Sequence, residues 1–257
     1  SRFFNTGKIN NDLISQLVNK IDSDLLSTNN PGSILIFLPG IMEINSCMKT
    51  ITSNFHRTSK NCIILPLHSA LSSQQQKKVF KTFKNKKKIV VATNIAETSI
   101  TIPDVVAVID LGRVKQMYYD FQLNCTKLVE TWCSKAEIKQ RRGRAGRIQS
   151  GICYHLYSME NYLENFLEQP IREIKRVRIE SIYLIIKSMG INNVAGFLKQ
   201  GIDSPDDLSI TKTKKFLLDI GATNVDDDDD NEAGEGDDKL TNLGKYLSML
   251  PMDIKAG

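Results

Sequence analysis

Residues 88–110, KIVVATNIAETSITIPDVVAVID, predict the fold of the chain more directly than any other stretch. Two short apolar runs in it, 88–92 and 105–109, are expected to be buried strands, and polar residues follow the first of them directly. Apolar strands that alternate with helices are typical of a parallel sheet covered on both faces. Ligands of such sheets bind beyond the carboxyl ends of the strands. The stretch therefore predicts an α/β domain with a site after Ala92.

The flanking sequence extends this pattern in both directions. Further strands are predicted at 33–38, 61–66 and 151–156, and helices at 11–26, 42–55 and 74–83. After about residue 169 the strand signal weakens, and helices are predicted at 179–189, at 213–220 and after a possible cap at Thr241. We therefore expect one domain over 1–169 and a smaller, mostly helical domain over 170–257.

Composition indicates a soluble protein of a reducing compartment. No apolar run approaches the roughly 20 residues that cross a bilayer, so no membrane partner is expected. The five cysteines form no C-x-x-C pair, which favours buried free thiols over disulfides or zinc. The expected location is the cytoplasm, with the nucleus as the alternative.

Charge is distributed unevenly along the chain. Residues 224–238, NVDDDDDNEAGEGDD, hold nine of the 29 acidic residues, and we interpret this run as a solvated, disordered insertion in the second domain. The rest carries 20 acidic residues against 34 Lys and Arg, a net charge of +14. Such a body is expected to attract a polyanion such as nucleic acid, although a merely soluble basic surface is the alternative.

The segment 140–147, QRRGRAGR, concentrates four arginines in eight residues. Arginine offers a fixed fork of donors that suits phosphate oxygens. If the segment is helical, Gln140, Arg144 and Arg147 share one face, as a site of phosphoryl transfer requires. An RNA-binding basic patch or a localisation signal is the alternative.

Two further segments carry polar or aromatic candidates. In 93–102, TNIAETSITI, Thr93 and Asn94 are candidates for contacts with a phosphate or sugar, but both are also good helix caps. In 67–80, LHSALSSQQQKKVF, Ser72 and Gln75 are predicted to form a capping box. Phe80, at the end of that segment, is either a core residue or a platform for a purine ring.

Together these segments resemble motifs IV to VI of the superfamily 2 DEAH/RHA helicases. The similar stretches are IFLPG (36–40), LHSALSSQQQKKVF (67–80), TNIAETSITIPDVVAVID (93–110) and QRRGRAGR (140–147). The resemblance implies a RecA-like parallel sheet sandwiched by helices. The sequence after residue 169 is similar to the family's winged-helix domain and the start of its ratchet domain. TSITIPDVV is closest in style to RHA-like and ribosome-associated members.

On the nucleotide side, the resemblance implies roles for seven residues. Arg144 and Arg147 would be arginine fingers for the γ-phosphate, and Gln140 would help to place the attacking water. Phe80 would stack on adenine, Ser99 would sense the nucleotide, and Thr101 belongs to the same motif. Pro103 stands where many relatives have an acidic residue, which puts the role of Asp104 at the ribose in doubt.

On the RNA side, the resemblance implies contacts to the backbone with little sequence preference. The implied residues are Gly40, Ser69, Thr93, Asn94, Arg113 and Lys115. RNA is therefore the expected partner, with the ribosome or another ribonucleoprotein as a further candidate.

A phosphate loop of the form G-x-x-x-x-G-K-[ST] and a DEAH-like tetrad do not occur in these 257 residues. The resemblance implies ATP with Mg²⁺ as cofactor, and we expect the metal ligands on an N-terminal RecA-like domain outside this chain. The chain alone is therefore expected to be inactive. The alternative is a non-catalytic RNA- or ribosome-binding scaffold module, and DNA helicase activity is a third possibility.

Overall fold

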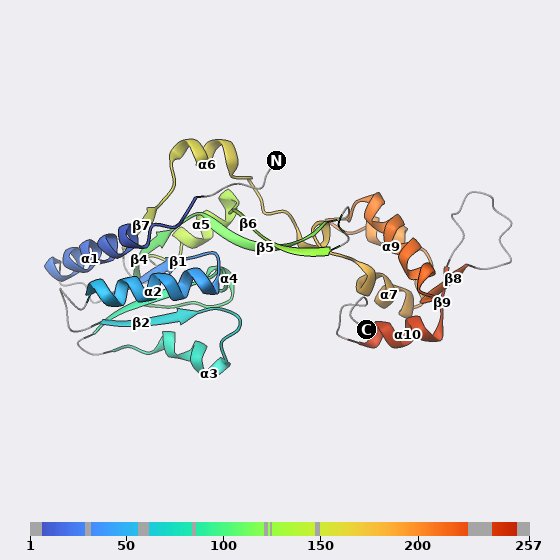
Figure 1. Ribbon diagram of the computed structural model, residues 1–257, viewed down its shortest axis with the longest axis horizontal. Helices are drawn as coiled ribbons and strands as arrows, with labels where there is room; N and C mark the ends of the chain where they lie inside the picture. The colour runs from blue at the N-terminus through green and yellow to red at the C-terminus, as the bar shows by residue number, and fades with distance from the viewer. Residues whose placement is uncertain are drawn as a thin grey trace. The chain divides into compact units, whose positions relative to one another are not determined.

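The computed structural model describes residues 7–28, 32–55, 62–83, 86–120, 123, 125–146, 150–225 and 238–250. The chain forms two compact units. The first comprises Ser1–Gln116 and Leu128–Pro170, and the second comprises Met117–Lys127 and Ile171–Gly257. Figure 1 shows the helices and strands of both units.

The first unit is built on a parallel sheet, as predicted. Its five strands are β1 (Ser33–Phe37), β2 (Cys62–Leu67), β3 (Lys87–Ala92), β4 (Val105–Asp110) and β7 (Ile152–His155). They lie in the order β2-β3-β1-β4-β7, and every neighbouring pair is parallel. The observed strand ends differ from the predicted ones by at most one residue, because the last hydrogen-bonded residue of a strand depends on its neighbour rather than on its own type.

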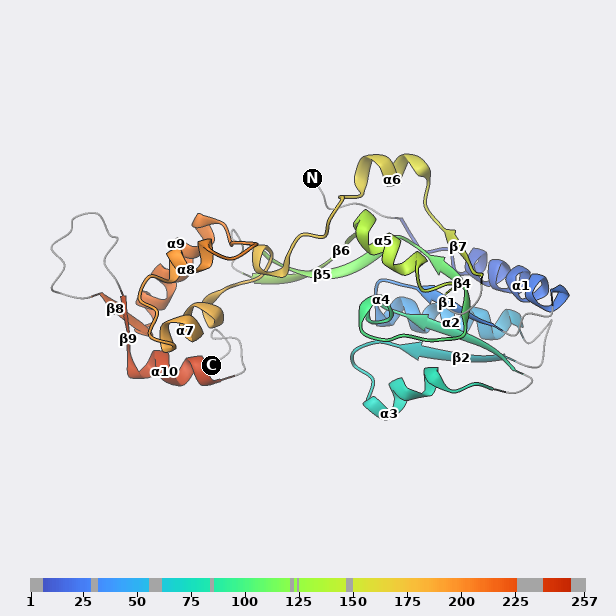
Figure 2. The ribbon, with the colours of Figure 1, turned by 180° about the vertical axis from the view of Figure 1, so that it is seen from behind.

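Successive residues of each strand point to opposite faces, so the sheet has two cores. One face packs against α1 (Asn11–Ser27) and α2 (Ile41–Phe55) through residues such as Ile34, Ile36 and Ile89. Leu35, Phe37 and Val90 point to the other face. There they pack with α4 (Ile95–Thr98) and with the turn that contains Val79, and α5 (Lys135–Arg142) lies on the same face in Figure 2.

The predicted helix over 74–83 is shorter than expected. It consists of α3 (Ser73–Gln76), followed by a 3₁₀ turn, η1 (Lys77–Phe80). The predicted capping box is confirmed: the Ser72 hydroxyl accepts the Gln75 N–H at 3.4 Å, and Gln75 Oε1 accepts the Ser72 N–H at 3.0 Å. The Lys88 ammonium donates hydrogen bonds to the carbonyls of Val79 in this turn and of Lys81 directly after it.

A β-hairpin that was not predicted follows the sheet. Its strands are β5 (Arg113–Asp120) and β6 (Cys125–Trp132). The hairpin tip, residues 117–127, groups with the second unit, because the Tyr119 N–H donates to the Arg176 carbonyl at 2.6 Å. The two units are thus not divided at one point near residue 169, since the hairpin contributes to both.

The remaining elements are mostly helical. In the first unit α6 (Met159–Asn165) follows β7. The second unit contains η2 (Glu173–Lys175), α7 (Glu180–Ser188), α8 (Val194–Lys199), α9 (Asp207–Asp219), β8 (Thr223–Val225), β9 (Asp238–Leu240) and α10 (Asn242–Met249). The predicted cap at Thr241 is confirmed, since its hydroxyl accepts the Gly244 N–H at 3.1 Å. The acidic run lies between β8 and β9, and its residues 226–237 are outside the described part of the chain.

Cysteine pairing and membrane-spanning helices were also considered in the sequence. All five cysteines are free thiols, but only Cys47 and Cys133 are buried, whereas Cys62 and Cys153 are partly buried and Cys125 is exposed. No helix among the described residues has the length and apolar character that a membrane span needs.

Candidate functional site

Four of the residues predicted to contact RNA lie at the carboxyl edge of the sheet. Ser69 follows β2, Thr93 and Asn94 follow β3, and Gly40 follows β1. The strand register brings them together, because Ala92 at the end of β3 pairs with the last residues of both β1 and β2. Side chains far apart in the sequence therefore share one edge.

Asn94 does not act as the helix cap that the sequence left open. It directly precedes α4, but its side chain makes no cap hydrogen bond, and it is exposed at the sheet edge. A good capping residue that does not cap its helix is available for another contact. The position thus favours the ligand interpretation over the cap.

Gly40 lies against an ion pair that includes Lys115. Lys115 Nζ is 2.6 Å from Glu43 Oε1, and a Cβ atom added at Gly40 would lie 2.6 Å from Glu43 Oε2 and 3.0 Å from Lys115 Nζ. A side chain at this position would therefore displace the pair. Glycine keeps the backbone and the Lys115 ammonium close together at the edge.

Arg113 is more constrained than the sequence indicated. Its guanidinium forms an ion pair with Glu130 at 3.4 Å and lies 5.5 Å from the centroid of the Trp132 ring. Burial lowers the pKa of Arg113 from its usual value, against the opposing effect of Glu130. These contacts hold Arg113 at the base of the hairpin.

The residues predicted for the nucleotide lie on the sheet face that carries α4 and α5. Lys88 is buried, and its ammonium donates to the carbonyls of Val79 at 2.7 Å and Lys81 at 3.3 Å. The same ammonium is 2.7 Å from Asp104 Oδ1. Lys88 therefore connects the turn that carries Phe80 to the residue that precedes β4.

Phe80 itself is not a core residue. Its side chain is 44% exposed, whereas the neighbouring Val79 is fully buried in the core of this face. An exposed ring on a turn fixed by Lys88 can stack on a planar ligand. Asp104, in contrast, is held by Lys88, which is consistent with the doubt that Pro103 raised about its role.

The segment 93–105 connects the two groups of residues. It starts at the carboxyl edge with Thr93, forms α4, and returns to the start of β4. Ser99 and Thr101 lie exposed along this return path, and Ser99 Oγ is 3.5 Å from Thr98 Oγ1.

The predicted common helical face in QRRGRAGR is wrong for Arg144. Helix α5 starts at a capping box between Ser134 and Glu137 and ends at Arg142, with Gly143 as its C-cap. Arg144 lies half-buried in the following turn, where its N–H donates to the Arg141 carbonyl at 3.0 Å. Gly146 then adopts φ +84°, a left-handed conformation that ends any helix. Arg147 lies outside the described residues.

Arg141 is the residue of this motif that the sequence interpretation missed. Its side chain is 1% exposed, and its Nε donates to Glu97 Oε2 at 3.0 Å. Its Nη1 donates to Asp110 Oδ1 at 3.0 Å and to the Arg113 carbonyl at 3.2 Å. The guanidinium also lies 4.9 Å from the centroid of the Phe37 ring. Arg141 thus connects α4, the end of β4 and the start of the hairpin.

The Glu97 and Asp110 carboxylates share the single Arg141 guanidinium, so one positive charge faces two acidic groups. Burial raises the pKa of Glu97 to about 7, although the nearby Arg141 opposes the shift. The sequence contained a signal for the burial of Arg141. Arg141 lies three residues after the apolar Ile138, and residues three apart share a helix face.

The described residues do not offer a metal site. No group of three or more His, Cys, Asp or Glu side chains in the described ranges is placed to hold an ion.

Comparison with known proteins agrees with this geometry. A model of the helicase conserved C-terminal domain matches residues 13–149, which contain β1 to β4 of the sheet, α4 and α5. The chain belongs to the helicase C-terminal domain family. This membership confirms the RecA-like fold that the motifs predicted.

Relatives of this helicase C-terminal domain are much longer proteins. The chain is 45% identical to the putative ATP-dependent RNA helicase YLR419W of Saccharomyces cerevisiae, covering 100% of this chain and 17% of that protein. It is 40% identical to human putative ATP-dependent RNA helicase DHX57, covering 97% of this chain and 18% of that protein. The chain thus spans less than a fifth of these relatives.

A solved structure shows the same fold. The DExH-box NTPase HrpB of E. coli has a TM-score of 0.73 and 26% identity, over 96% of this chain and 28% of that chain. The predicted resemblance to DEAH/RHA helicases is confirmed by these similarities.

Proposed function

We propose that this helicase C-terminal domain is the second motor domain of an ATP-dependent RNA helicase. In the full-length protein it would couple ATP hydrolysis to movement along RNA or to remodelling of a ribonucleoprotein. The observation that carries the proposal is the position of Arg141, which contacts Glu97 in α4 and Asp110 at the carboxyl edge. It gives the nucleotide side and the RNA side a common rigid connection.

On the ATP side, this chain supplies contacts but not the whole site. The exposed Phe80 ring is suited to stack on adenine, and Ser99 and Thr101 lie on the connecting segment. Arg144 and Arg147 would stabilise the negative charge that develops on the γ-phosphate, with Gln140 orienting water. Mg²⁺ would neutralise phosphate charge when it is bound by the N-terminal RecA-like domain, which is the partner that this proposal requires.

On the RNA side, the edge residues offer hydroxyl, amide, backbone and ammonium groups. Such groups suit phosphate and sugar atoms, so RNA binding should depend on salt and little on base sequence. The net charge of +14 outside the acidic run supports this, since its field attracts a polyanion.

The cellular location, the role of the second unit and the larger partner are proposed from the family resemblance alone. We propose a cytoplasmic protein, a winged-helix role for the second unit, and the ribosome or another ribonucleoprotein as partner. The support for the winged-helix role is the similarity of the sequence after residue 169 to the family's winged-helix domain, and the support for the ribosome is the RHA-like style of TSITIPDVV at 98–106.

Arg144→Ala in the full-length protein tests the proposal. We expect RNA-stimulated ATP hydrolysis to fall by about 10³-fold or more, the contribution typical of an arginine finger, while RNA affinity stays nearly unchanged. Arg172→Ala is a matched control, because Arg172 is exposed in the second unit and pairs with Asp203 there. Normal turnover in Arg144→Ala would contradict the finger assignment. RNA binding without ATPase in the unmodified protein would favour a scaffold module.

A further inference from the structure

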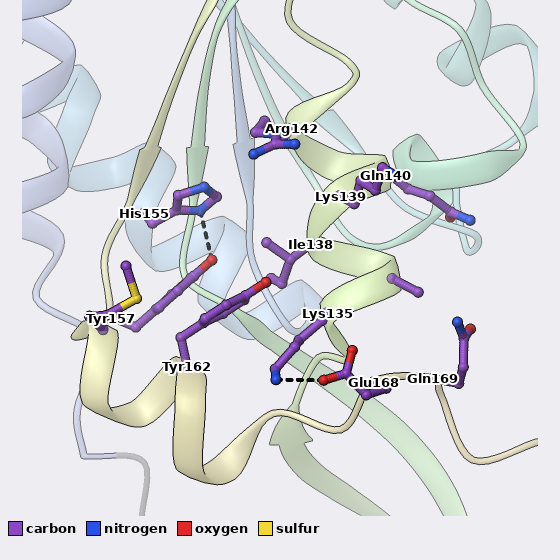
Figure 3. A pocket seen from close by; sticks show the side chains of 12 residues that line it. Lys135, Ile138, Lys139, Gln140, Arg142, His155, Tyr157, Tyr162, Glu168 and Gln169 are labelled. Carbon is purple, nitrogen blue, oxygen red and sulfur yellow. Dashed lines mark hydrogen bonds and ion pairs between the residues drawn. The ribbon is translucent and has the colours of Figure 1, made fainter.

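A cavity of about 980 Å³ lies in the first unit, beside α5. It is bounded by α5, by the end of β7 and by α6, as Figure 3 shows. Of the predicted site residues that the structure describes, only Gln140 lines it. The volume is in the range of small-molecule sites in proteins, which span roughly 300–1,000 Å³.

One wall of the cavity is aromatic. Tyr157 and Tyr162 have ring planes 13° apart and ring centroids at 6.2 Å, and both rings are half-buried. Tyr157 Oη is 2.7 Å from His155 Nδ1, which fixes the orientation of the Tyr157 ring. In Figure 3 the two tyrosines point toward α5. The wall thus presents ordered aromatic rings, and the Lys135 ammonium lies 5.5 Å from the centroid of the Tyr162 ring.

The other wall is basic. Lys139 and Arg142, both on α5, are exposed, and neither makes a hydrogen bond or ion pair with another side chain in the described part of the chain. Lys135 differs, because its ammonium is 2.6 Å from Glu168 Oε1. Partial burial lowers the pKa of His155, so its ring is neutral near pH 7. The uncompensated positive charge therefore comes from Lys139 and Arg142.

We propose that this cavity binds a nucleotide unit, with its base on the Tyr157 and Tyr162 wall and its phosphate between Lys139 and Arg142. Stacking on aromatic rings and pairing with cations are the two contacts that nucleotides make with little regard to base identity. An acidic peptide would meet the cations but would leave the aromatic wall without a planar partner. Phe80 does not line this cavity, and Gln140 is, among the described residues, the one lining residue that it shares with the proposed ATP site. Binding there is therefore measurable without turnover.

The nucleotide can come from either of two sources, a free mononucleotide or one residue of single-stranded RNA. Fluorescence titration of the 257-residue chain with 2-aminopurine ribonucleoside 5′-monophosphate tests the first source. A short oligouridylate that contains one 2-aminopurine tests the second. Stacking on tyrosine quenches the probe in both arms. Either arm alone supports the site, and comparison of the two affinities identifies the source.

Matched variants tie the signal to the cavity. The double variant Lys139→Ala/Arg142→Ala and the single variant Tyr162→Leu should each weaken binding by about tenfold or more, in line with a lost stacking or phosphate contact. Lys49→Ala, on α2 at the opposite face of the sheet, should bind like the unmodified chain. Circular dichroism and thermal melting show whether Tyr162→Leu remains folded, and the double variant changes only exposed side chains.

Three results would overturn the proposal. The first is unchanged affinity in the double variant. The second is loss of the signal in Phe80→Ala, which would place the probe on the ATP side. The third is competition by an oligo-aspartate peptide that binds as tightly as the nucleotide and is insensitive to Tyr162→Leu. Binding that persists in Arg144→Ala separates this site from the proposed hydrolysis.

Discussion

Arg141 Nε donates to Glu97 Oε2 at 3.0 Å, and both side chains are almost fully buried. The two residues come from segments 44 positions apart in the sequence, α5 and α4. The contact lies between the residues predicted to bind nucleotide and those predicted to bind RNA. Because a buried charge needs its partner, this pair fixes the relative position of the two segments.

Arg141→Ala should destabilise the first unit strongly. Removing the guanidinium leaves the Glu97 and Asp110 carboxylates buried without their cation, and breaking a buried pair typically costs about 3–5 kcal/mol. Urea denaturation measures the loss. Arg142→Ala, at the exposed neighbouring position, should change the free energy of unfolding by less than about 0.5 kcal/mol. Equal stability of the two variants would contradict the structural role of Arg141.

Glu97 should make the stability of the first unit depend on pH. Its pKa rises from 4.5 to about 7 in the folded state, so between these values the folded chain binds more protons than the unfolded chain. The free energy of unfolding therefore falls as pH increases through this window, by an amount on the order of 3 kcal/mol. Denaturation curves at pH 5 and pH 7.5 measure it.

Glu97→Gln should flatten this dependence, because glutamine does not titrate. Glu173→Gln, at an exposed position of the second unit, should retain the pH dependence of the unmodified chain. If Glu97→Gln loses stability between pH 5 and pH 7.5 as steeply as the unmodified chain, another group is responsible.

Asn94→Ala should separate helix capping from RNA binding. The side chain makes no cap hydrogen bond, so the free energy of unfolding should change by less than about 0.5 kcal/mol rather than the typical 1 kcal/mol of a lost cap. The affinity for single-stranded RNA, measured by fluorescence anisotropy, should fall by about threefold to tenfold for all base sequences alike. Ser72→Ala is the capping control, since Ser72 does cap its helix. If Asn94→Ala lost as much stability as Ser72→Ala, the Asn94 side chain would have to be regarded as a helix cap.

Phe80→Ala should affect nucleotide binding more than folding. A ring that is 44% exposed contributes little to the core, so we expect a stability loss below about 1 kcal/mol. In the full-length protein KM for ATP should rise by about tenfold, the value of a lost stacking contact. Val79→Ala, one residue earlier and fully buried, should show the reverse pattern, with a large stability loss. An unchanged KM in Phe80→Ala would exclude the stacking role.

The sheet and its carboxyl edge were predictable from the sequence because strand signals are local. Runs such as 88–92 and 105–109 are apolar throughout, as strands buried on both faces must be. Once the strands are parallel, the residues that follow them have to meet at one edge, so the grouping of Ser69, Thr93 and Gly40 followed directly. The hairpin of β5 and β6 was missed, because its strands are only partly buried and alternate weakly.

Which charged side chains are buried, and which partners they contact, was in contrast decided only by the tertiary structure. QRRGRAGR identifies a cluster of arginines, but helical spacing placed Arg144 on the face of Gln140 and assigned no partner to Arg141. The fold buries Arg141 between Glu97 and Asp110, and Gly143 ends the helix before Arg144. The reason is physical. Local sequence determines which residues can form a helix or strand, whereas the burial of a charge depends on partners that chain folding brings from distant positions.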